Sequence, residues 1–86
     1  MSSYKIRFAR PARKDLEALP AKIQDRILDA IASLKGDPRP HGCKKLKGSE
    51  NAYRIRVGDY RVIYEIDDDV IVVLIVRIRH RKDAYQ

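Results

Sequence analysis

The sequence predicts a two-layer α+β domain, with an N-terminal strand and a helical hairpin packed on one face of a mainly antiparallel sheet of four to five strands. Three observations support this fold class. Residues 4–8 alternate between apolar and basic side chains, as in a half-buried strand. Apolar residues then recur every three or four positions between Ile23 and Leu34, as on one face of a helix. Three strand-like runs separated by turn residues follow from residue 52 onward. This order, β-α-α-β-β-β, is typical of a single two-layer domain, here spanning residues 1–86.

The two helices are predicted from their apolar positions and their boundaries. The stretch ARPARKDLEALP, residues 9–20, offers Leu16 and Leu19 as apolar anchors, and Pro11 suits a first helical turn. Pro20 interrupts the pattern and can begin a second helix, which Lys35 and Gly36 bring to an end. We therefore expect a helical hairpin.

The second half of the chain is predicted to form the sheet. After the rigid connector DPRPHG, the segment CKKLKGSEN is short and basic and could hold a brief edge strand around Leu46. Strands are expected at about 52–57, 60–66 and 70–78, with the turn before the last one at Asp67–Asp69. The run VIVVLIV is continuously apolar, which favours a strand that is central or covered on both faces.

Composition narrows the function to classes with anionic partners. Nineteen Lys and Arg against twelve Asp and Glu give a net charge of +7, which favours nucleic acid, although a basic protein without such a role stays open. The sequence contains no apolar run long enough to span a bilayer and no signal-peptide core, so no membrane partner is expected. The one cysteine, Cys43, excludes an intrachain disulfide and makes a reducing cytoplasm the default location.

The hairpin YRIRVGDYRVIYE, residues 53–65, gathers arginines on one side of the sheet. Closing it with a two-residue turn at Gly58-Asp59 places Arg56 opposite Arg61 and Ile55 opposite Val62. Alternation then directs the tyrosines and valines to one face and Arg54, Arg56 and Arg61 to the other. Such a face could be merely solvated, since opposed like charges cost only about 0.2 to 1 kcal/mol. It could also form an anion cradle, in which a phosphate turns the repulsion into charge-assisted hydrogen bonds.

Two further segments, RPHGCKKLKG and RIRHRKDAY, add to this set of cations. A three-residue turn at 67–69 would direct Arg77 to the same face as Arg61, whereas a two-residue turn would reverse that direction. An aromatic side chain such as Tyr85 beside cations suits single-stranded RNA, although Tyr85 could equally pack on the core. The candidate RNA-binding residues are Lys44, Lys45, Lys47, Arg77, Arg79 and Lys82.

The segments KLKG, YRIRVGDYRVIYE and VRIRHRKDAY resemble the RelE toxins of the RelE/ParE superfamily of bacterial toxin–antitoxin systems. The resemblance covers essentially the whole chain. It implies a ribosome-dependent endoribonuclease that cuts messenger RNA in the ribosomal A site without a metal or cofactor. In that reaction the 2′-hydroxyl attacks the adjacent phosphate and leaves a 2′,3′-cyclic phosphate and a 5′-hydroxyl. Carried over by position, the implied catalytic residues are Arg54, Arg56, Arg61, Arg81 and Tyr85.

The resemblance has one departure, which concerns the general base. The best-known members carry lysines where this chain has Arg54 and Arg56, and an arginine effectively cannot lose its proton. His80 titrates in a suitable range, but a lone histidine beside cations is more often a bystander. Glu50 and His41 are weaker candidates, so the base stays open.

Two alternative functions and a set of partners accompany this interpretation. The chain could be a ParE-like inhibitor of DNA gyrase, which needs no catalytic cluster. It could also be a plain nucleic-acid-binding module or a relative that has lost activity. Either kind of toxin implies a cognate antitoxin with an acidic, partly disordered segment that wraps the basic surface in a hetero-oligomer. The nuclease also implies the 70S ribosome and messenger RNA as partners.

Overall fold

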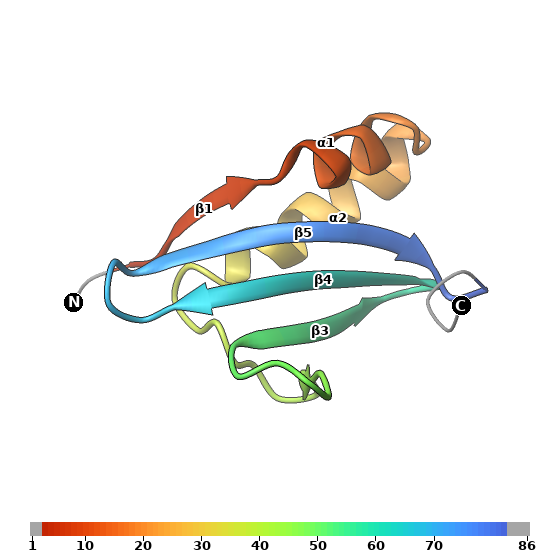
Figure 1. Cartoon of the computed structure of the whole chain (residues 1–86). Helices are drawn as coiled ribbons and strands as arrows, with labels where there is room; N and C mark the ends of the chain where they lie inside the picture. Colours follow the sequence, from red (N-terminus) through yellow and green to blue (C-terminus); the bar gives the residue numbers. More distant parts are fainter. Residues whose placement is uncertain (1–2, 83–86) are drawn as a thin grey trace.

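The computed structural model describes residues 3–82, which form two helices and a five-stranded sheet (Figure 1). The predicted order of elements is confirmed, with the short edge strand included. The elements are β1 (Lys5–Phe8), α1 (Arg10–Glu17), α2 (Ala21–Ser33), β2 (Lys44–Lys45), β3 (Ala52–Val57), β4 (Tyr60–Asp67) and β5 (Val72–His80).

The strands lie in the order β1-β5-β4-β3-β2. Strand β1 pairs parallel to β5, and the other three pairings are antiparallel. The predicted fold class is confirmed, and β1 lies within the sheet as an edge strand. Its backbone joins the ladder, since Lys5 N–H donates to Ile71 C=O at 2.9 Å.

Both helices cover the same face of the sheet, which leaves the opposite face open (Figure 1). The predicted apolar stripe of α2 faces the sheet, with Ile27 and Ile31 buried, and α1 buries Ala12. Pro11 lies in the first turn of α1, as expected. Within the described residues, neither helix is long and apolar enough to cross a membrane. The core forms where these helices meet the inward-facing residues Ile55, Val62, Tyr64, Ile66, Val73, Ile75 and Ile78.

The register of the β3–β4 hairpin is the predicted one. Arg56 lies opposite Arg61 and Ile55 opposite Val62 across the two-residue turn. Gly58 has a φ of 59°, which suits glycine at the first turn position, and a Cβ there would lie 3.3 Å from Nη2 of Arg26 on α2.

The β4–β5 connection differs from the prediction in two ways. Strand β4 extends to Asp67 and β5 begins at Val72, so the turn comprises residues 68–71 rather than 67–69. A β-bulge then interrupts the pairing, because Tyr64 lies opposite Ile75 whereas Ile63 lies opposite Arg77. Val76 is the extra residue, and beyond it the alternation of β5 is reversed.

Candidate active site

Basic side chains form two rows across the open face of the sheet, at the end near the β3–β4 hairpin. In the first row Arg56, Arg61 and Arg79 lie opposite one another on β3, β4 and β5. The second row runs from β2 to β5 through four residues that lie opposite one another in turn: Lys44, Arg54, Ile63 and Arg77. Because neighbouring strands lie about 4.8 Å apart, each row spans only about 10 to 15 Å. We call these two rows the arginine face.

Arg61 occupies the centre of this face and is buried. Only 6% of its surface is exposed. Its Nη1 lies 3.4 Å from Tyr60 C=O, a long hydrogen bond, and its Nε has no hydrogen-bond partner within residues 3–82. A buried guanidinium with an unsatisfied donor is costly, and an anion is the group that would offset that cost.

Arg77 and Arg79 reach the arginine face because of the bulge at Val76. The four-residue turn alone would have directed both side chains toward the helices, and the extra residue reverses this direction. Asp15 of α1 holds this part of β5: it accepts hydrogen bonds from Ile78 N–H at 2.9 Å and from Nε and Nη2 of Arg77 at 2.9 and 3.2 Å. Arg77 is therefore engaged by a carboxylate, whereas Arg79 has no ion pair within the described part of the chain.

Arg81 lies beside the hairpin turn, next to the first row. Its backbone N–H donates to Asp59 C=O at 2.7 Å, and its Nε lies 4.0 Å from the Asp59 carboxylate. Its side chain is 60% exposed. Lys82 follows in an exposed turn. The predicted stacking residue Tyr85 lies outside the described residues.

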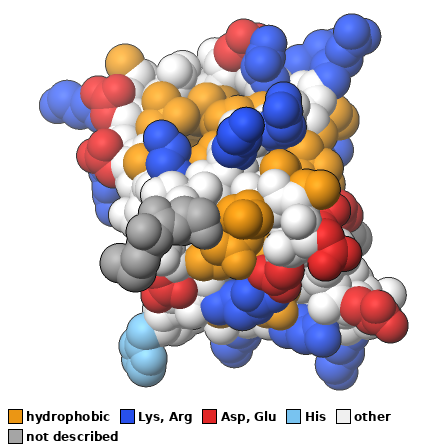
Figure 2. Space-filling model, turned by 90° about the vertical axis from the view of Figure 1, so that its left-hand side faces the viewer, with side chains coloured by type: hydrophobic (Ala, Val, Ile, Leu, Met, Phe, Trp, Pro, Cys, Tyr) orange, Lys and Arg blue, Asp and Glu red, His pale blue; other side chains and the backbone are white. Residues whose placement is uncertain are grey.

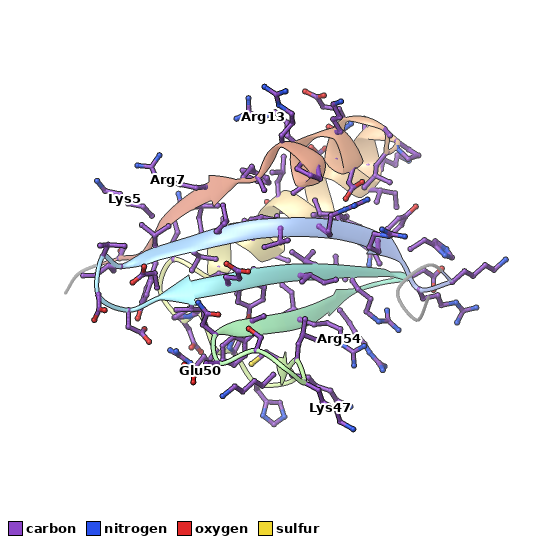
Figure 3. All side chains as sticks on the ribbon, viewed as in Figure 1. Lys5, Arg7, Arg13, Lys47, Glu50 and Arg54 are labelled. Carbon is purple, nitrogen blue, oxygen red and sulfur yellow. The ribbon has the colours of Figure 1, made fainter. Side chains whose placement is uncertain are left out.

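The lysines of the segment CKKLKGSEN divide between the two sides of the sheet. Lys44 lies on the arginine face through its pairing with Arg54, whereas Lys45 pairs with Tyr53 and alternates to the other side. Lys47 and Arg54 lie together at one corner of the molecule, while Lys5 and Arg7 project from the opposite edge of the sheet (Figure 3). By strand register, Lys44, Arg54, Arg56, Arg61 and Arg79 share the open face, whereas the guanidinium of Arg77 reaches Asp15 of α1 and Lys45 lies on the other side.

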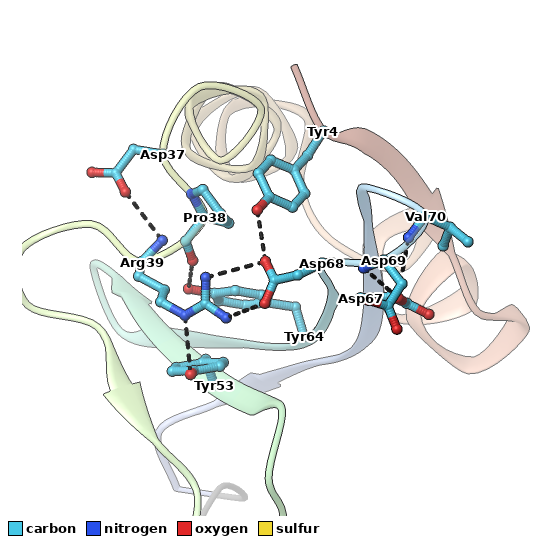
Figure 4. A network of polar contacts seen from close by, with 10 residues as sticks. All are labelled: Tyr4, Asp37, Pro38, Arg39, Tyr53, Tyr64, Asp67, Asp68, Asp69 and Val70. Carbon is cyan, nitrogen blue, oxygen red and sulfur yellow. Dashed lines mark hydrogen bonds and ion pairs between the residues drawn. The ribbon is translucent and has the colours of Figure 1, made fainter. Parts of the chain in front are cut away.

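A polar network fixes the connector that precedes β2 (Figure 4). Arg39 donates from Nη2 to Asp68 at 2.9 Å and from Nε to Tyr53 Oη at 3.1 Å, with its guanidinium over the Tyr53 ring. Tyr4 Oη donates to Asp68 at 2.7 Å. The hydrogen bond from Arg39 holds the pKa of Asp68 below its usual range, and the bond to Asp68 raises the pKa of Tyr4.

A buried tyrosine completes the attachment of this connector. Tyr64 Oη donates to Pro38 C=O at 2.8 Å. The pKa of its phenol is raised, mainly because the ring is buried and to a smaller extent because Cys43 lies nearby. Cys43 packs against the core. The connector is therefore fixed to β3, β4 and the β4–β5 turn, and holds Lys44 beside Arg54.

The other half of the open face is chemically mixed. It carries Val72 and Leu74 of β5 beside Glu65 of β4 and Arg7 of β1, around a hollow of about 350 Å³. Val70 in the neighbouring turn is 63% exposed. Figure 2 views the molecule from this end and shows apolar, basic and acidic side chains interspersed.

Sequence reasoning missed the groups that position the arginine face. Asp15 and Asp68 acquire a role only through their pairing with Arg77 and Arg39, across 62 and 29 residues. No local signal in the sequence identifies either contact. Within residues 3–82, no three His, Cys, Asp or Glu side chains lie close enough together to hold a metal ion.

Comparisons with known proteins agree with this arrangement. A family model described as ParE toxin of the type II toxin–antitoxin system parDE matches residues 6–85. The toxin RelG of Mycobacterium tuberculosis is 34% identical over 84 residues, covering 96% of this chain and 97% of the relative. The RelE chain of the archaeal RelE–RelB complex from Pyrococcus horikoshii superposes with a TM-score of 0.83 at 31% identity, covering 95% of this chain and 99% of that one. The Escherichia coli mRNA interferase toxin RelE is more distant, at 24% identity over 96% of this chain and 90% of the relative.

A helical hairpin on a five-stranded sheet with an arginine-rich open face defines a small toxin of the RelE/ParE type. The chain belongs to the RelE family of type II toxin–antitoxin toxins within that superfamily.

Proposed function

We propose that the protein is a ribosome-dependent endoribonuclease that cleaves messenger RNA in the ribosomal A site, without a metal or cofactor. Two kinds of support favour this activity. The Escherichia coli relative bears the name mRNA interferase. The arginine face offers charge for an RNA backbone on the side of the sheet that the two helices leave uncovered.

The buried position of Arg61 between Arg56 and Arg79 is the observation that carries the proposal. A phosphodiester placed over this row would meet three guanidinium groups on neighbouring strands. Arginine binds phosphate oxygens in a bidentate manner, and a buried site strengthens each contact.

The reaction is the one that the resemblance to the RelE toxins implies. The 2′-oxygen forms a bond to phosphorus, the bond from phosphorus to the 5′-oxygen breaks, and the leaving oxygen takes a proton from water. Negative charge increases on the phosphate oxygens at the transition state. Cations that are already in position stabilise that charge without reorganising, which is often the largest single contribution to catalysis. Arg61 has this role, and Arg81 lies closest to the leaving oxygen by family analogy.

Toeprinting of a translated message tests the proposal directly. We expect new 3′ ends at the A-site codon when the protein is added to translating ribosomes, and almost none when the same RNA is naked. Arg61→Ala should abolish these ends, whereas Lys22→Ala on the exposed start of α2 should not. Intact ribosome-bound message at saturating protein would refute the activity.

A second candidate is inhibition of DNA gyrase by protein binding. It is favoured by the matching family model, whose description names the ParE toxin. It predicts that the protein blocks supercoiling by purified gyrase and that Arg61→Ala retains this effect. Supercoiling that proceeds normally in the presence of the protein would exclude this candidate.

We further propose a cognate antitoxin as the partner that controls the protein in the cytoplasm. The support is the RelE–RelB complex of the Pyrococcus horikoshii relative. The +7 net charge and the open arginine face favour an acidic segment that wraps this surface and folds on binding. Co-expression with the product of the neighbouring reading frame should yield a hetero-oligomer. Recovery of the two proteins as separate species would contradict this expectation.

A further inference from the structure

The proposed reaction needs a group that accepts the proton of the 2′-hydroxyl, and the arginines of the arginine face cannot supply one. Arg54, Arg56 and Arg61 stay protonated at any physiological pH. They can stabilise charge but cannot remove a proton. A titratable side chain at the border of this face can accept the proton instead.

His80 is directed away from the arginine face. It lies opposite Tyr60, and this pair alternates to the side of the sheet that the helices cover. Its ring packs edge-on against Tyr60 at 5.2 Å, and its Nδ1 accepts a hydrogen bond from Lys82 N–H at 3.2 Å. His80 is thus placed as a structural side chain.

The nearby carboxylates are also poorly placed. Glu65 lies on the open face but four residues along β4 from Arg61, a separation of about 13 Å. Asp59 lies at the hairpin turn, with its carboxylate toward Arg81.

His41 lines a groove that adjoins the first row. The groove has a volume of about 560 Å³ and is lined by His41 and Lys44 together with Arg56 of β3. It lies along the edge of β3 beyond the end of β2, because β2 pairs only with residues 53 and 54. Helix α2 forms the opposite wall with Ala30 and Ser33, so Lys44 and Arg56 are the charged groups that line the groove with His41.

The backbone around His41 is fixed in place. Cys43 N–H donates to Pro40 C=O at 3.0 Å, and Gly42 has a φ of 92°. This is the pattern of a type II turn, with His41 at the first central position. The preceding residue pair, Pro38 and Arg39, is held by Tyr64, Tyr53 and Asp68. The imidazole thus projects from a rigid turn rather than from a mobile loop.

We infer that His41 is the proton acceptor of the cleavage reaction, working in the groove that it shares with Arg56 and Lys44. This inference rests on the proposed nuclease activity. The neutral imidazole takes the proton of the 2′-hydroxyl as the bond from the 2′-oxygen to phosphorus forms. The bond to the 5′-oxygen breaks, that oxygen takes a proton from water, and the imidazolium returns its own proton to solvent.

Single-turnover cleavage of ribosome-bound message, measured across the pH range at saturating protein, tests this role. The wild-type rate should rise with pH over the range in which imidazole loses its proton, between about pH 5 and 8. His41→Gln should lower the rate by about 10²- to 10⁴-fold, the usual contribution of a general base, and should remove that rise. His80→Gln is the matched control and should retain both the rate and the pH dependence.

Two outcomes would overturn the assignment. One is a His41→Gln rate within about threefold of wild type; the other is a slow variant whose rate rises with pH as the wild type does, since that pattern indicates a structural role. Added imidazole should restore cleavage to His41→Ala, because the groove is open, and failure of this rescue would count against the assignment. If wild-type protein itself leaves the message intact, the nuclease proposal fails instead.

Discussion

The two halves of the open sheet face are built on the same strands but carry different side chains. Near the β3–β4 hairpin, Arg56, Arg61 and Arg79 form a row in which acids are absent from the paired positions. Near the β4–β5 turn, the same strands carry Glu65 and Leu74, with Arg7 on the neighbouring edge. A solvated face needs no such segregation. The difference is what the proposed binding of an RNA phosphate at the hairpin end predicts.

The largest expected effect is a difference in cleavage rate between substitution of Arg61, in the hairpin half, and of Arg7, in the mixed half. Arg61→Ala should lower the rate of message cleavage by about 10²- to 10³-fold, the usual result of removing one preorganised donor to a transition-state oxyanion. Arg7→Ala, on the same face but in the mixed half, should leave the rate within about threefold. Cleavage rates measured on translating ribosomes give both values. Equal losses in the two variants would mean that only total charge matters.

The next effect concerns the stability of β5 just beyond the bulge at Val76, where Asp15 binds Arg77 and Ile78. Asp15→Ala removes the acceptor for Ile78 N–H and for Arg77, and should lower the free energy of unfolding by about 1 to 3 kcal/mol. Glu17→Ala, on the exposed side of the same helix, should change it by less than about 0.5 kcal/mol. Urea unfolding compares the two. If both variants match wild type, Asp15 does not hold the bulge.

A smaller effect is expected for a single lysine. Lys44→Ala should reduce the salt dependence of binding to single-stranded RNA by about 0.7 in the slope of log K against log salt, the value for one lost phosphate contact. Lys5→Ala, at the opposite edge of the sheet, should leave that slope nearly unchanged. Titrations at several salt concentrations measure it. A similar change in both variants would indicate that RNA contacts the whole open face.

The smallest effect lies in the network that anchors the connector. Because the hydrogen bonds from Arg39 and Tyr4 lower the folded-state pKa of Asp68, its carboxylate stabilises the fold above the usual carboxyl pKa of about 3.9. That stabilisation is lost as pH falls through the lowered folded-state value. Asp68→Asn should therefore melt slightly below wild type at neutral pH and together with it in strong acid. Asp69→Asn, in the same turn, serves as the control, and a difference that persists in acid would contradict this linkage.

The hairpin could be predicted from the sequence because local chemistry determines it. A two-residue turn beginning with Gly58 allows one register, and the alternation of Arg54 and Arg56 with apolar residues then decides which face each occupies. The helices could also be predicted from the sequence, since Ile27 and Ile31 recur with the helical period.

The pairing of β5 could not be predicted in the same way. The run VIVVLIV contains no alternation, so nothing in it marks where the phase changes. The expected direction of Arg77 is confirmed, but through a four-residue turn followed by a bulge rather than through a three-residue turn. The long-range contacts of Arg39 with Asp68 and of Asp15 with Arg77 likewise depend on tertiary proximity, which no local pattern reveals.

Because of the extra residue in β5, odd-numbered side chains face the helices before the bulge and even-numbered side chains face them after it. Val73 and Ile75 face the helices at odd positions, whereas Ile78 and His80 do so at even positions. A ladder that kept Val76 but continued past Ile75 without a bulge would therefore direct Arg77 and Arg79 toward the helices and Ile78 toward the open face. A chain that lost Val76 would instead keep both arginines on the open face, because Arg77 would then follow Ile75 and still lie opposite Ile63.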